Sequence, residues 1–418
     1  MINVNDFDGT NDSIVINEAI KNRDADGIVV IPPRSSMYES YRDYWLLDSA
    51  ILLPENTTII LENCTIKLSD DCRDNFFRSA NCGMGIVEPE KIENIHIRGE
   101  GMCTLLGADH PRAVGDESKI LSNPCPYLDE DLCKYADWIP EERKQAKTLL
   151  FSDKHNHSYG TDAGKEGESQ MGDWRGVGIL LANVANFSVS NLKIVESHGW
   201  GISLEACSYG SVENIEFDAR MYKEIDGILH NMENQDGVDI RIGCHHITIS
   251  DIYGRTGDDL VALTAIASPQ YHNGGALCTT EVMHNDWTRR EQGIHDISIR
   301  NVSGYSQLCH IVRLLACDTK IWNVDIDGVI DSPPENLKHS STIFIGEKKD
   351  SLYGKILPGS VSNVSISNVI CCSKKAIYVA GYLSDSVISN VVNKNPDCPT
   401  IGVYREDGLV NVKTSNIL

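Results

Sequence analysis

The sequence predicts an all-β fold, a right-handed parallel β-helix in which short strands stack into a solenoid, with an N-terminal capping helix and long loop insertions. From Gly176 onward a pattern of apolar-x-apolar-x-Asn/Asp-apolar recurs, in FSVSNL, ITISDI, ISIRNV and VSISNV. Two recurrences are 22 residues apart, from Asn301 to Asn323 and from Asn368 to Asn390. Short strands near this period indicate stacked coils. A β-sandwich would not keep Asn at one register, whereas stacked coils align Asn side chains as a ladder.

The residues predicted to form the ladder are the Asn or Asp that precedes the last apolar residue of each motif. They are Asn191, Asp251, Asn301 and Asn368, with looser copies at Asn214, Asn323 and Asn390.

Residues 1–35 are predicted to cap one end of the solenoid. The segment IVINEAIKN is an amphipathic helix candidate, and Asn11 or Asp12 can cap it by accepting hydrogen bonds from its free N–H groups. The strand candidate GIVVIPP follows. Further short strands are predicted in LLDSAILL, TTIILENCTIKL and NIHIRGEGMCTLLG, which lie between residues 45 and 107.

The stretch 107–173 breaks the pattern, because it is polar and has no apolar period apart from one helix candidate, PEERKQAKTLL. A long irregular segment of this kind is either a surface elaboration or a loop that shapes a substrate site. The main coils, with the catalytic face, are expected in 174–418, interrupted by insertions at 267–293 and 331–339. We expect the whole chain, 1–418, to form a single domain.

Composition narrows the class of partner. The formal net charge of −23 argues against nucleic acid or an anionic membrane surface as a partner. No run of about 20 apolar residues is present, as a membrane span requires. The N-terminus has neither the basic region nor the apolar core of a signal peptide. We therefore expect a cytoplasmic protein, or a secreted one if a leader was removed, with a homo-oligomer left open.

Two acidic turns, Asn234–Gly237 and Gly257–Asp259, frame the strand candidate HHITISDI. Asp258 follows Asp236 by 22 residues, about one coil, so Asp236, Asp258 and Asp259 are predicted to stack on one face. Carboxylates this close cannot all ionise normally, and a site thereby obtains a proton donor and a base at one pH. Each turn alone is also explained by turn preference, and paired carboxylates also bind calcium.

These residues give the chain its resemblance to the polygalacturonase-type glycoside hydrolases of family 28, in the pectin-lyase-like β-helix superfamily. The resemblance is strong over 174–316 and weak over the N-terminal cap. NQDGVD stands where that family has Asn-Thr-Asp-Gly, GDD matches its Gly-Asp-Asp turn, and ESHGWGISLEAC is similar to the preceding strand. His310 takes the place of the family's Gly-His-Gly histidine, without the flanking glycines. The family's Arg-Ile-Lys substrate motif is not recognisable, and His310 with Arg313 is the nearest basic pair.

The resemblance implies inverting glycoside hydrolysis, with Asp258 as general acid and Asp236 with Asp259 orienting and deprotonating water. Inverting carboxyl pairs are usually roughly 6.5–9.5 Å apart. Adjacent strand residues point to opposite faces, so Asp258 and Asp259 both reach a cleft only if the turn at Gly257 distorts the backbone. His310 would tune the acid's proton or bind a sugar hydroxyl, or be structural.

Arg313 is predicted either to pair with a substrate carboxylate or to neutralise the acidic cluster. The other substrate-binding candidates are polar or aromatic residues on these coils, and each Trp is equally explained as core: Asn234, Arg241, Trp200, His198 and Trp174. No cofactor and no metal site is predicted. The segment HNHS at 155–158 lacks a ligand set, and adjacent His245 and His246 in a strand should face opposite ways.

The sequence therefore predicts a glycosidase acting on an oligosaccharide from pectin or another uronate- or rhamnose-containing plant cell-wall glycan. The segments 107–173 and 267–293 would block one end of the cleft and favour exo-action. A β-helix lyase or epimerase is less favoured, because it needs a basic group and a means to neutralise the substrate's acid. The other alternative is a non-catalytic glycan-binding solenoid, with the Asp turns holding calcium or nothing.

Overall fold

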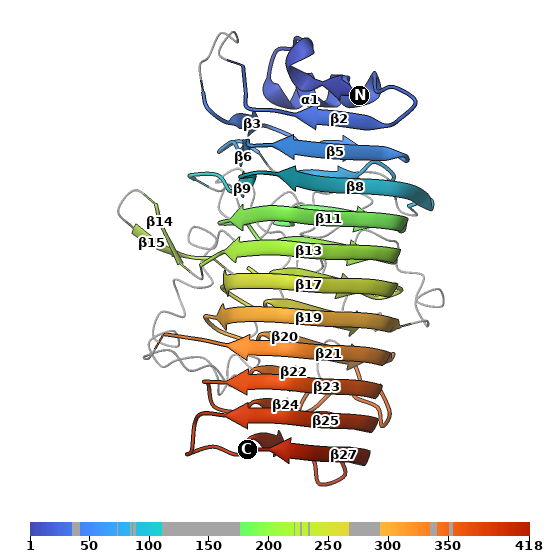
Figure 1. Ribbon diagram of the computed structural model, residues 1–418, viewed down its shortest axis with the longest axis vertical. Coiled ribbons are helices and arrows are strands. Elements are labelled where there is room, and N and C mark those ends of the chain that lie inside the picture. Colours follow the sequence, from blue (N-terminus) through green and yellow to red (C-terminus); the bar gives the residue numbers. More distant parts are fainter. Residues whose placement is uncertain are drawn as a thin grey trace.

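The structure is a stack of coils along one axis, with the two ends of the described chain at opposite ends of the stack (Figure 1). It is a computed structural model that describes residues 1–35, 42–72, 74–83, 86, 89–110, 176–220, 222–225, 228–232, 235–266, 293–334, 341–350 and 354–418. Every strand pair of the two large sheets is parallel. The prediction of a right-handed parallel β-helix is confirmed. The predicted helix PEERKQAKTLL lies outside the described residues.

The larger sheet contributes one strand to each coil, and these strands are short only at the N-terminal end of the stack. In spatial order these strands are β1 (Ile2–Asn3), β2 (Ile28–Ile31), β5 (Thr57–Glu62), β8 (Ile92–Glu100), β11 (Val184–Val195), β13 (Ser208–Asp218), β17 (His245–Thr256), β19 (Ile294–Ser306), β21 (Ile321–Asp331), β23 (Val361–Cys371), β25 (Leu383–Asn393) and β27 (Leu409–Ile417), with the short β3 (Trp45–Leu47), β6 (Thr65–Leu68) and β9 (Thr104–Leu106) beside them.

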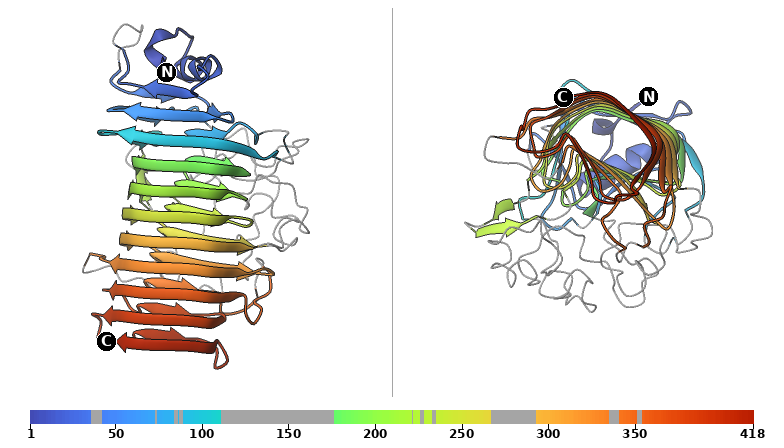
Figure 2. Two further views of the ribbon diagram at one scale, coloured as in Figure 1. Left: turned by 45° about the vertical axis from the view of Figure 1, so that its right-hand side comes forward. Right: turned by 90° about the horizontal axis from the view of Figure 1, so that it is seen from below.

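The second sheet forms another wall of the stack and, like the first, extends along its length (Figure 2). Its strands are β4 (Ile51–Leu53), β7 (Phe77–Ser79), β10 (Ile179–Ala182), β12 (Ile202–Glu205), β16 (Val238–Arg241), β18 (Val261–Ile266), β20 (Val312–Cys317), β22 (Ile343–Ile345), β24 (Ile377–Val379) and β26 (Ile401–Val403). A separate antiparallel hairpin is formed by β14 (Tyr222–Ile225) and β15 (Ile228–Asn231).

Apolar side chains from both sheets form one core that runs the length of the stack, from Val4 to Val391. Inward positions of the long strands alternate with outward polar ones, as in β17, where Ile247, Ile249 and Ile252 are buried. Each coil therefore buries its inward residues against the coils above and below, which is the main stabilising contribution in a solenoid.

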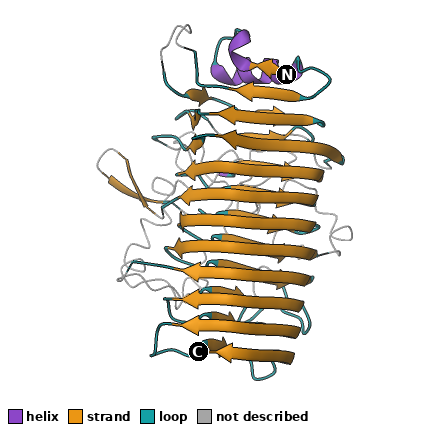
Figure 3. Ribbon diagram, viewed as in Figure 1, coloured by secondary structure: helices purple, strands orange, loops and turns teal. Residues whose placement is uncertain are grey.

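The helix α1 (Asp12–Lys21), preceded by the 3₁₀ turn η1 (Val4–Asp6), lies at the N-terminal end of the stack (Figure 3). Asn11 is its N-cap and accepts a 2.9 Å hydrogen bond from the amide of Ile14, as predicted. Asp12 is instead buried and pairs with Arg34 and Arg42 at 2.9 Å. No helix in the described ranges is long and apolar enough to cross a membrane.

The long strands bend at left-handed residues, mostly Asn or Asp, which tolerate this conformation better than other residues. One row of them includes Asn191, Asn214, Asp251 and Asn301, and Asn214 donates to Asn191 at 2.9 Å. The predicted ladder is therefore present.

A second, parallel row corrects one predicted position. Asn323 donates to Asp296 at 3.0 Å and accepts from Asn363 at 3.4 Å, so it is not the next copy of Asn301. The coil from β19 to β21 is 27 residues long, because Ile297 pairs with Val324, and the 22-residue spacing was coincidental there.

Candidate active site

Asp236, Asp259 and His310 take equivalent places on three successive coils. The amide of Gly237 donates to the carbonyl of Asp259 at 2.9 Å, and the amide of Leu260 donates to the carbonyl of His310 at 3.0 Å. Each residue thus lies just before a strand of the second sheet, namely β16, β18 and β20. Adjacent parallel strands are about 4.8 Å apart, so these side chains form a short row across three coils.

Gly237 is required by this close stacking and not by a left-handed turn. A Cβ at Gly237 would lie 2.3 Å from the carbonyl oxygen of Leu260 and 3.1 Å from the ring of Phe217. The Asp-Gly pair that the sequence offers as a turn signal therefore keeps two coils in contact beside Asp236.

Asp258 and Asp259 both reach the site because they lie in the turn between β17 and β18, where strand alternation does not apply. The amide of Asp259 donates to Oδ1 of Asp258 at 3.0 Å, and the hydroxyl of Thr256 donates to the carbonyl of Asp258 at 2.7 Å. Gly257 is not left-handed. One carboxylate oxygen of each Asp and the thiol of Cys309 lie within 4.8 Å of one another. This approach is closer than the usual inverting separation.

The structure adds Asp239, which the sequence analysis did not single out. It is the second residue of β16, pairs in register with Ser203 and Ala262, and is 1% exposed. Neither of its carboxylate oxygens has a hydrogen-bond partner among the described residues. The available signal was the second acid of NQDGVD, which alternation places on the same strand face as Arg241.

Burial makes this cluster hold protons. Desolvation, followed by the charges of Asp239, Asp258 and Asp259, raises the pKa of Asp236 well above its ordinary value. Desolvation also raises the pKa of Asp239, although the charge of Arg241 opposes it. The pKa of Asp259 is raised by burial and then by Asp258, against Arg313 and the amide of His310. The cluster therefore titrates as a unit and retains a proton that a single exposed Asp would lose.

His310 and Arg313 both pack against Phe344 on the next coil. The ring of His310 stacks on Phe344 with centroids 4.5 Å apart, and the guanidinium of Arg313 lies 4.2 Å from the ring centroid of Phe344. Nδ1 of His310 is 3.0 Å from the carbonyl oxygen of Ser341. Arg313 forms an ion pair with Glu347. Its pairing with a substrate carboxylate and its neutralising of the acidic cluster both stay predictions.

The remaining substrate-binding candidates are buried or lie outside the described residues. Trp200 is 8% exposed, belongs to an apolar cluster, and has the guanidinium of Arg241 4.6 Å from its ring. His198 accepts a 3.0 Å hydrogen bond from the amide of Ala108 at Nε2. Asn234 and Trp174 lie outside the described residues. Trp200 and His198 thus have packing roles, and their contact with substrate stays a prediction.

The expectation that His245 and His246 face opposite ways is wrong. Their Nδ1 atoms are 2.9 Å apart, because His246 has a left-handed φ of 55°, which turns its side chain to the same side as that of its neighbour. The segment HNHS at 155–158 lies outside the described residues.

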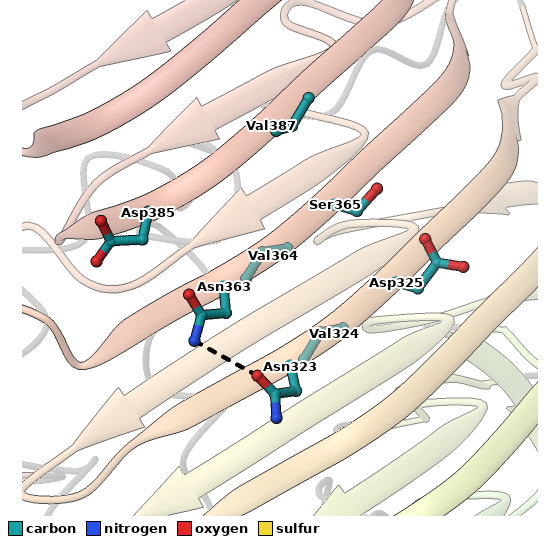
Figure 4. Close-up of a pocket in the computed structure, with 8 residues that line it drawn as sticks. All are labelled: Asn323, Val324, Asp325, Asn363, Val364, Ser365, Asp385 and Val387. Atoms are coloured by element: carbon teal, nitrogen blue, oxygen red, sulfur yellow. Dashed lines mark hydrogen bonds between the residues drawn. The ribbon is translucent and has the colours of Figure 1, made fainter.

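A shallow groove on the larger sheet is distinct from the acidic cluster (Figure 4). Residues of β21, β23 and β25 line it, and Asn363 donates to Asn323 across it at 3.4 Å. The acidic cluster belongs to the second sheet and the turns before its strands, so this groove contributes no residue to it.

A family model matches the part of the chain that contains the acidic cluster. The family model described as glycosyl hydrolases family 28 matches residues 165–323, which include all four acids and His310. No curated protein matches the chain.

Solved structures share the fold at low sequence identity. An endo-xylogalacturonan hydrolase from Aspergillus tubingensis has a TM-score of 0.52 at 13% identity, over 98% of this chain and 89% of that one. A polygalacturonase from Erwinia carotovora ssp. carotovora has a TM-score of 0.50 at 16% identity, over 97% of this chain and 91% of that one. PfbA, a surface adhesin of Streptococcus pneumoniae, has a TM-score of 0.52 at 14% identity, over 96% of this chain and 81% of that one.

The adhesin shows that this fold alone does not define an activity. The family match, in contrast, falls on the coils that hold the acidic cluster. The chain is therefore a right-handed β-helix protein, similar in fold to a polygalacturonase, and its residues 165–323 match the family model of the glycosyl hydrolases family 28.

Proposed function

We propose that the protein hydrolyses a glycosidic bond in a pectin-like, uronate-containing polysaccharide or oligosaccharide. The observation that carries this proposal is the meeting of Asp236, Asp239, Asp258 and Asp259 on two successive coils, inside the segment that matches the family. The family match supports a glycoside hydrolase, and similarity to pectin-degrading enzymes supports the substrate class.

Asp258 is assigned as the general acid in this proposal. It is the partly exposed member of the cluster, whereas Asp236 and Asp259 are 6% and 8% exposed. A glycosidic oxygen entering from solvent therefore meets Asp258 first. The neighbouring carboxylates disfavour full ionisation of the cluster, which keeps a proton available for the leaving oxygen.

Asp236 and Asp259 are assigned to the water. Their equivalent places on adjacent coils allow both to contact one small molecule between them, and the amide of His310 together with Arg313 favours ionised Asp259. Asp259 would then deprotonate the water as it attacks the anomeric carbon. The close approach of Asp258 and Asp259 makes the stereochemical outcome the sharpest test of inversion, since retaining enzymes hold their carboxyls closer together.

Exo-action on short fragments is also part of the proposal. It is supported by the length of two segments: 107–173, which precedes the acidic coils in the sequence, and 267–293, which lies between β18 and β19. Product analysis on a long polymer distinguishes exo-action from endo-action. An exo-enzyme releases only the smallest product from the start of the reaction, whereas an endo-enzyme first releases fragments of mixed length.

The test is an assay of wild type, Asp258→Asn and Asp236→Asn on polygalacturonate, xylogalacturonan and rhamnogalacturonan, with and without chelator. Asp385→Asn is the matched control, because Asp385 is an exposed member of the side-chain ladder. We expect hydrolysis by wild type and Asp385→Asn, unaffected by chelator, and a loss of roughly 10²–10⁴-fold in Asp258→Asn. Proton NMR of the first product should show the inverted anomer.

Two other outcomes would overturn the proposal, and a third would change the roles of the acids. An unsaturated, ultraviolet-absorbing product would indicate a lyase. Calcium-dependent retention of glycan without turnover would indicate a binding solenoid. Retention of configuration would keep the hydrolase and reassign Asp258 or Asp259 as a nucleophile.

A further inference from the structure

Three imidazoles and one carboxylate gather on the outer surface where β17 and β19 begin. Asp236 precedes β16 and His245 follows it, so this cluster lies past the opposite end of that strand from the acidic site. His245 and His295 pair in register on the two long strands, and their rings stack with centroids 5.1 Å apart and planes 4° from parallel.

Left-handed backbone at the next residue of each strand completes the cluster. His246 has a φ of 55° and Asp296 a φ of 56°. Residues in this conformation interrupt strand alternation, so each side chain lies beside that of its preceding neighbour instead of on the opposite face. Two adjacent coils thereby present a two-by-two array, His245 and His246 on one and His295 and Asp296 on the other.

The donor atoms are at distances suited to a shared ion. Oδ2 of Asp296 is 2.7 Å from Nδ1 of His295 and 3.7 Å from Nδ1 of His246, and one ligand atom of each of these residues lies within 4.8 Å of the others. Ligand bonds of about 2.0–2.2 Å in a tetrahedral zinc site place the ligand atoms roughly 3.3–3.6 Å apart. Small side-chain rotations therefore suffice to bring the three donors around one ion.

We propose that His246, His295 and Asp296 form a binding site for a zinc-type divalent transition ion that joins the coils of β17 and β19. Two imidazoles and one carboxylate suit Zn²⁺ and similar ions, whereas Ca²⁺ and Mg²⁺ prefer oxygen ligands throughout. The site is open enough for water to complete the coordination, because side-chain exposure is 47% for His246, 35% for Asp296 and 20% for His295.

Outer contacts hold two of the ligands in place. The side-chain amide of Asn323 donates to Oδ1 of Asp296 at 3.0 Å, which leaves Oδ2 directed to the imidazoles. The ring of Trp322 stacks on His295 at a centroid distance of 4.3 Å. Such outer contacts orient metal ligands and reduce the entropy lost on binding.

A purely aromatic and hydrogen-bonded stack is the competing explanation. It accounts for the ring contacts, and the 2.9 Å approach of the Nδ1 atoms of His245 and His246 is then a hydrogen bond from one imidazole to the other. The two explanations differ in whether the metal-free protein takes up one equivalent of ion with a change in stability.

The experiment uses the full chain freed of metal, titrated with Zn²⁺ by calorimetry and with Co²⁺ by visible absorption. The variants are His246→Asn and Asp296→Asn. Asn suits both positions, because the equivalent left-handed residues on other coils include Asn186 and Asn323. These variants are therefore expected to fold. His110→Gln is the matched control, since exposed His110 pairs with the carboxylate of Asp70 at 2.8 Å and lies on another coil.

We expect one saturable equivalent in wild type and in His110→Gln, a Co²⁺ absorption band of nitrogen and oxygen ligation, and a Tm that rises with zinc concentration. Binding should weaken roughly tenfold or more in each ligand variant. It should survive in Asp258→Asn, which separates it from ion binding at the acidic cluster. No saturable binding, or equal binding by His246→Asn and wild type, would overturn the proposal without affecting the proposed hydrolase.

Discussion

The backbone amide of His310 donates a 2.8 Å hydrogen bond to Oδ1 of Asp259, a residue 51 positions earlier in the chain. One carboxylate of the acidic cluster is therefore held by the backbone of the next coil and not by its own turn. The cluster's geometry depends on the stacking of coils, so substitutions that disturb the stacking should affect activity even when they touch no acid.

Replacing Arg313 with Gln should move the pH profile of catalysis. The charge of Arg313 lowers the pKa of Asp259 against burial, so its removal should raise that pKa and delay ionisation of the proposed base. We expect the acidic limb of the kcat/KM profile to shift upward by about one pH unit. Arg300→Gln, which removes an exposed Arg paired with Asp325 at 3.3 Å, is the control. A rise in KM with an unmoved profile would instead indicate direct contact with a substrate carboxylate.

Replacing Asp239 with Asn should stabilise the protein increasingly as pH rises. Burial raises the folded-state pKa of Asp239, so this group's contribution to stability is full below the unfolded pKa and is lost as pH rises through the folded value. The Asn side chain does not titrate, so the variant does not lose this stability as pH rises. The Tm of the variant minus that of wild type should therefore grow from about pH 4 to about pH 7. A difference that stays constant with pH would show that Asp239 does not hold a proton in the folded state.

Replacing Gly237 with Ala should reduce both stability and activity. The added Cβ would lie 2.3 Å from the carbonyl oxygen of Leu260, so the coils beside Asp236 must separate. We expect a loss of about 1–3 kcal/mol in the free energy of unfolding, as for other overpacked sites. Gly402→Ala is the control, because the atoms nearest its Cβ would belong to the side chains of Lys375 and Tyr378 and not to the backbone of an adjacent coil. Equal losses of stability in both variants would argue against a special role for the contact at Gly237.

The ladder should respond differently to Ala and Gly. Asn214 has a φ of 53° and donates to Asn191 at 2.9 Å. Asn214→Ala loses the hydrogen bond and places a poorly tolerated residue in left-handed backbone, which costs roughly 1–2 kcal/mol on its own. Asn214→Gly also loses the hydrogen bond, but Gly tolerates left-handed backbone and so avoids the second cost. Chemical denaturation should therefore rank the free energies of unfolding as wild type, Gly variant, Ala variant, and an inverted order of the two variants would contradict this explanation.

The fold was accessible from the sequence because strand alternation and left-handed Asn residues are local properties that repeat. Coil length is not local, since it depends on where each turn rejoins the stack. That is why Asn323 was assigned to the wrong row, although its motif was recognised. Asp258 and Asp259 lie in a turn between two strands, where side chains do not alternate between faces. Strand alternation alone therefore could not predict their orientation.

The site was accessible only in part. The turns carrying Asp236, Asp258 and Asp259 have a recognisable spacing, whereas Asp239 shows its importance only through burial beside other acids. The array around His246 depends on a left-handed histidine at a place where most other coils have Asn or Asp, so the repeat of Asn and Asp does not identify it.

The strands keep one register although the coils differ in length. Asn301 donates to Asp251 at 3.2 Å across 50 residues, while Asn390 donates to Asn368 at 3.3 Å across 22. Connections between strands can therefore lengthen without resetting the stack that carries the acids. This modularity makes the connections suitable places for exchange between related solenoids, so that grafting should alter the proposed substrate preference while the acidic cluster is left intact.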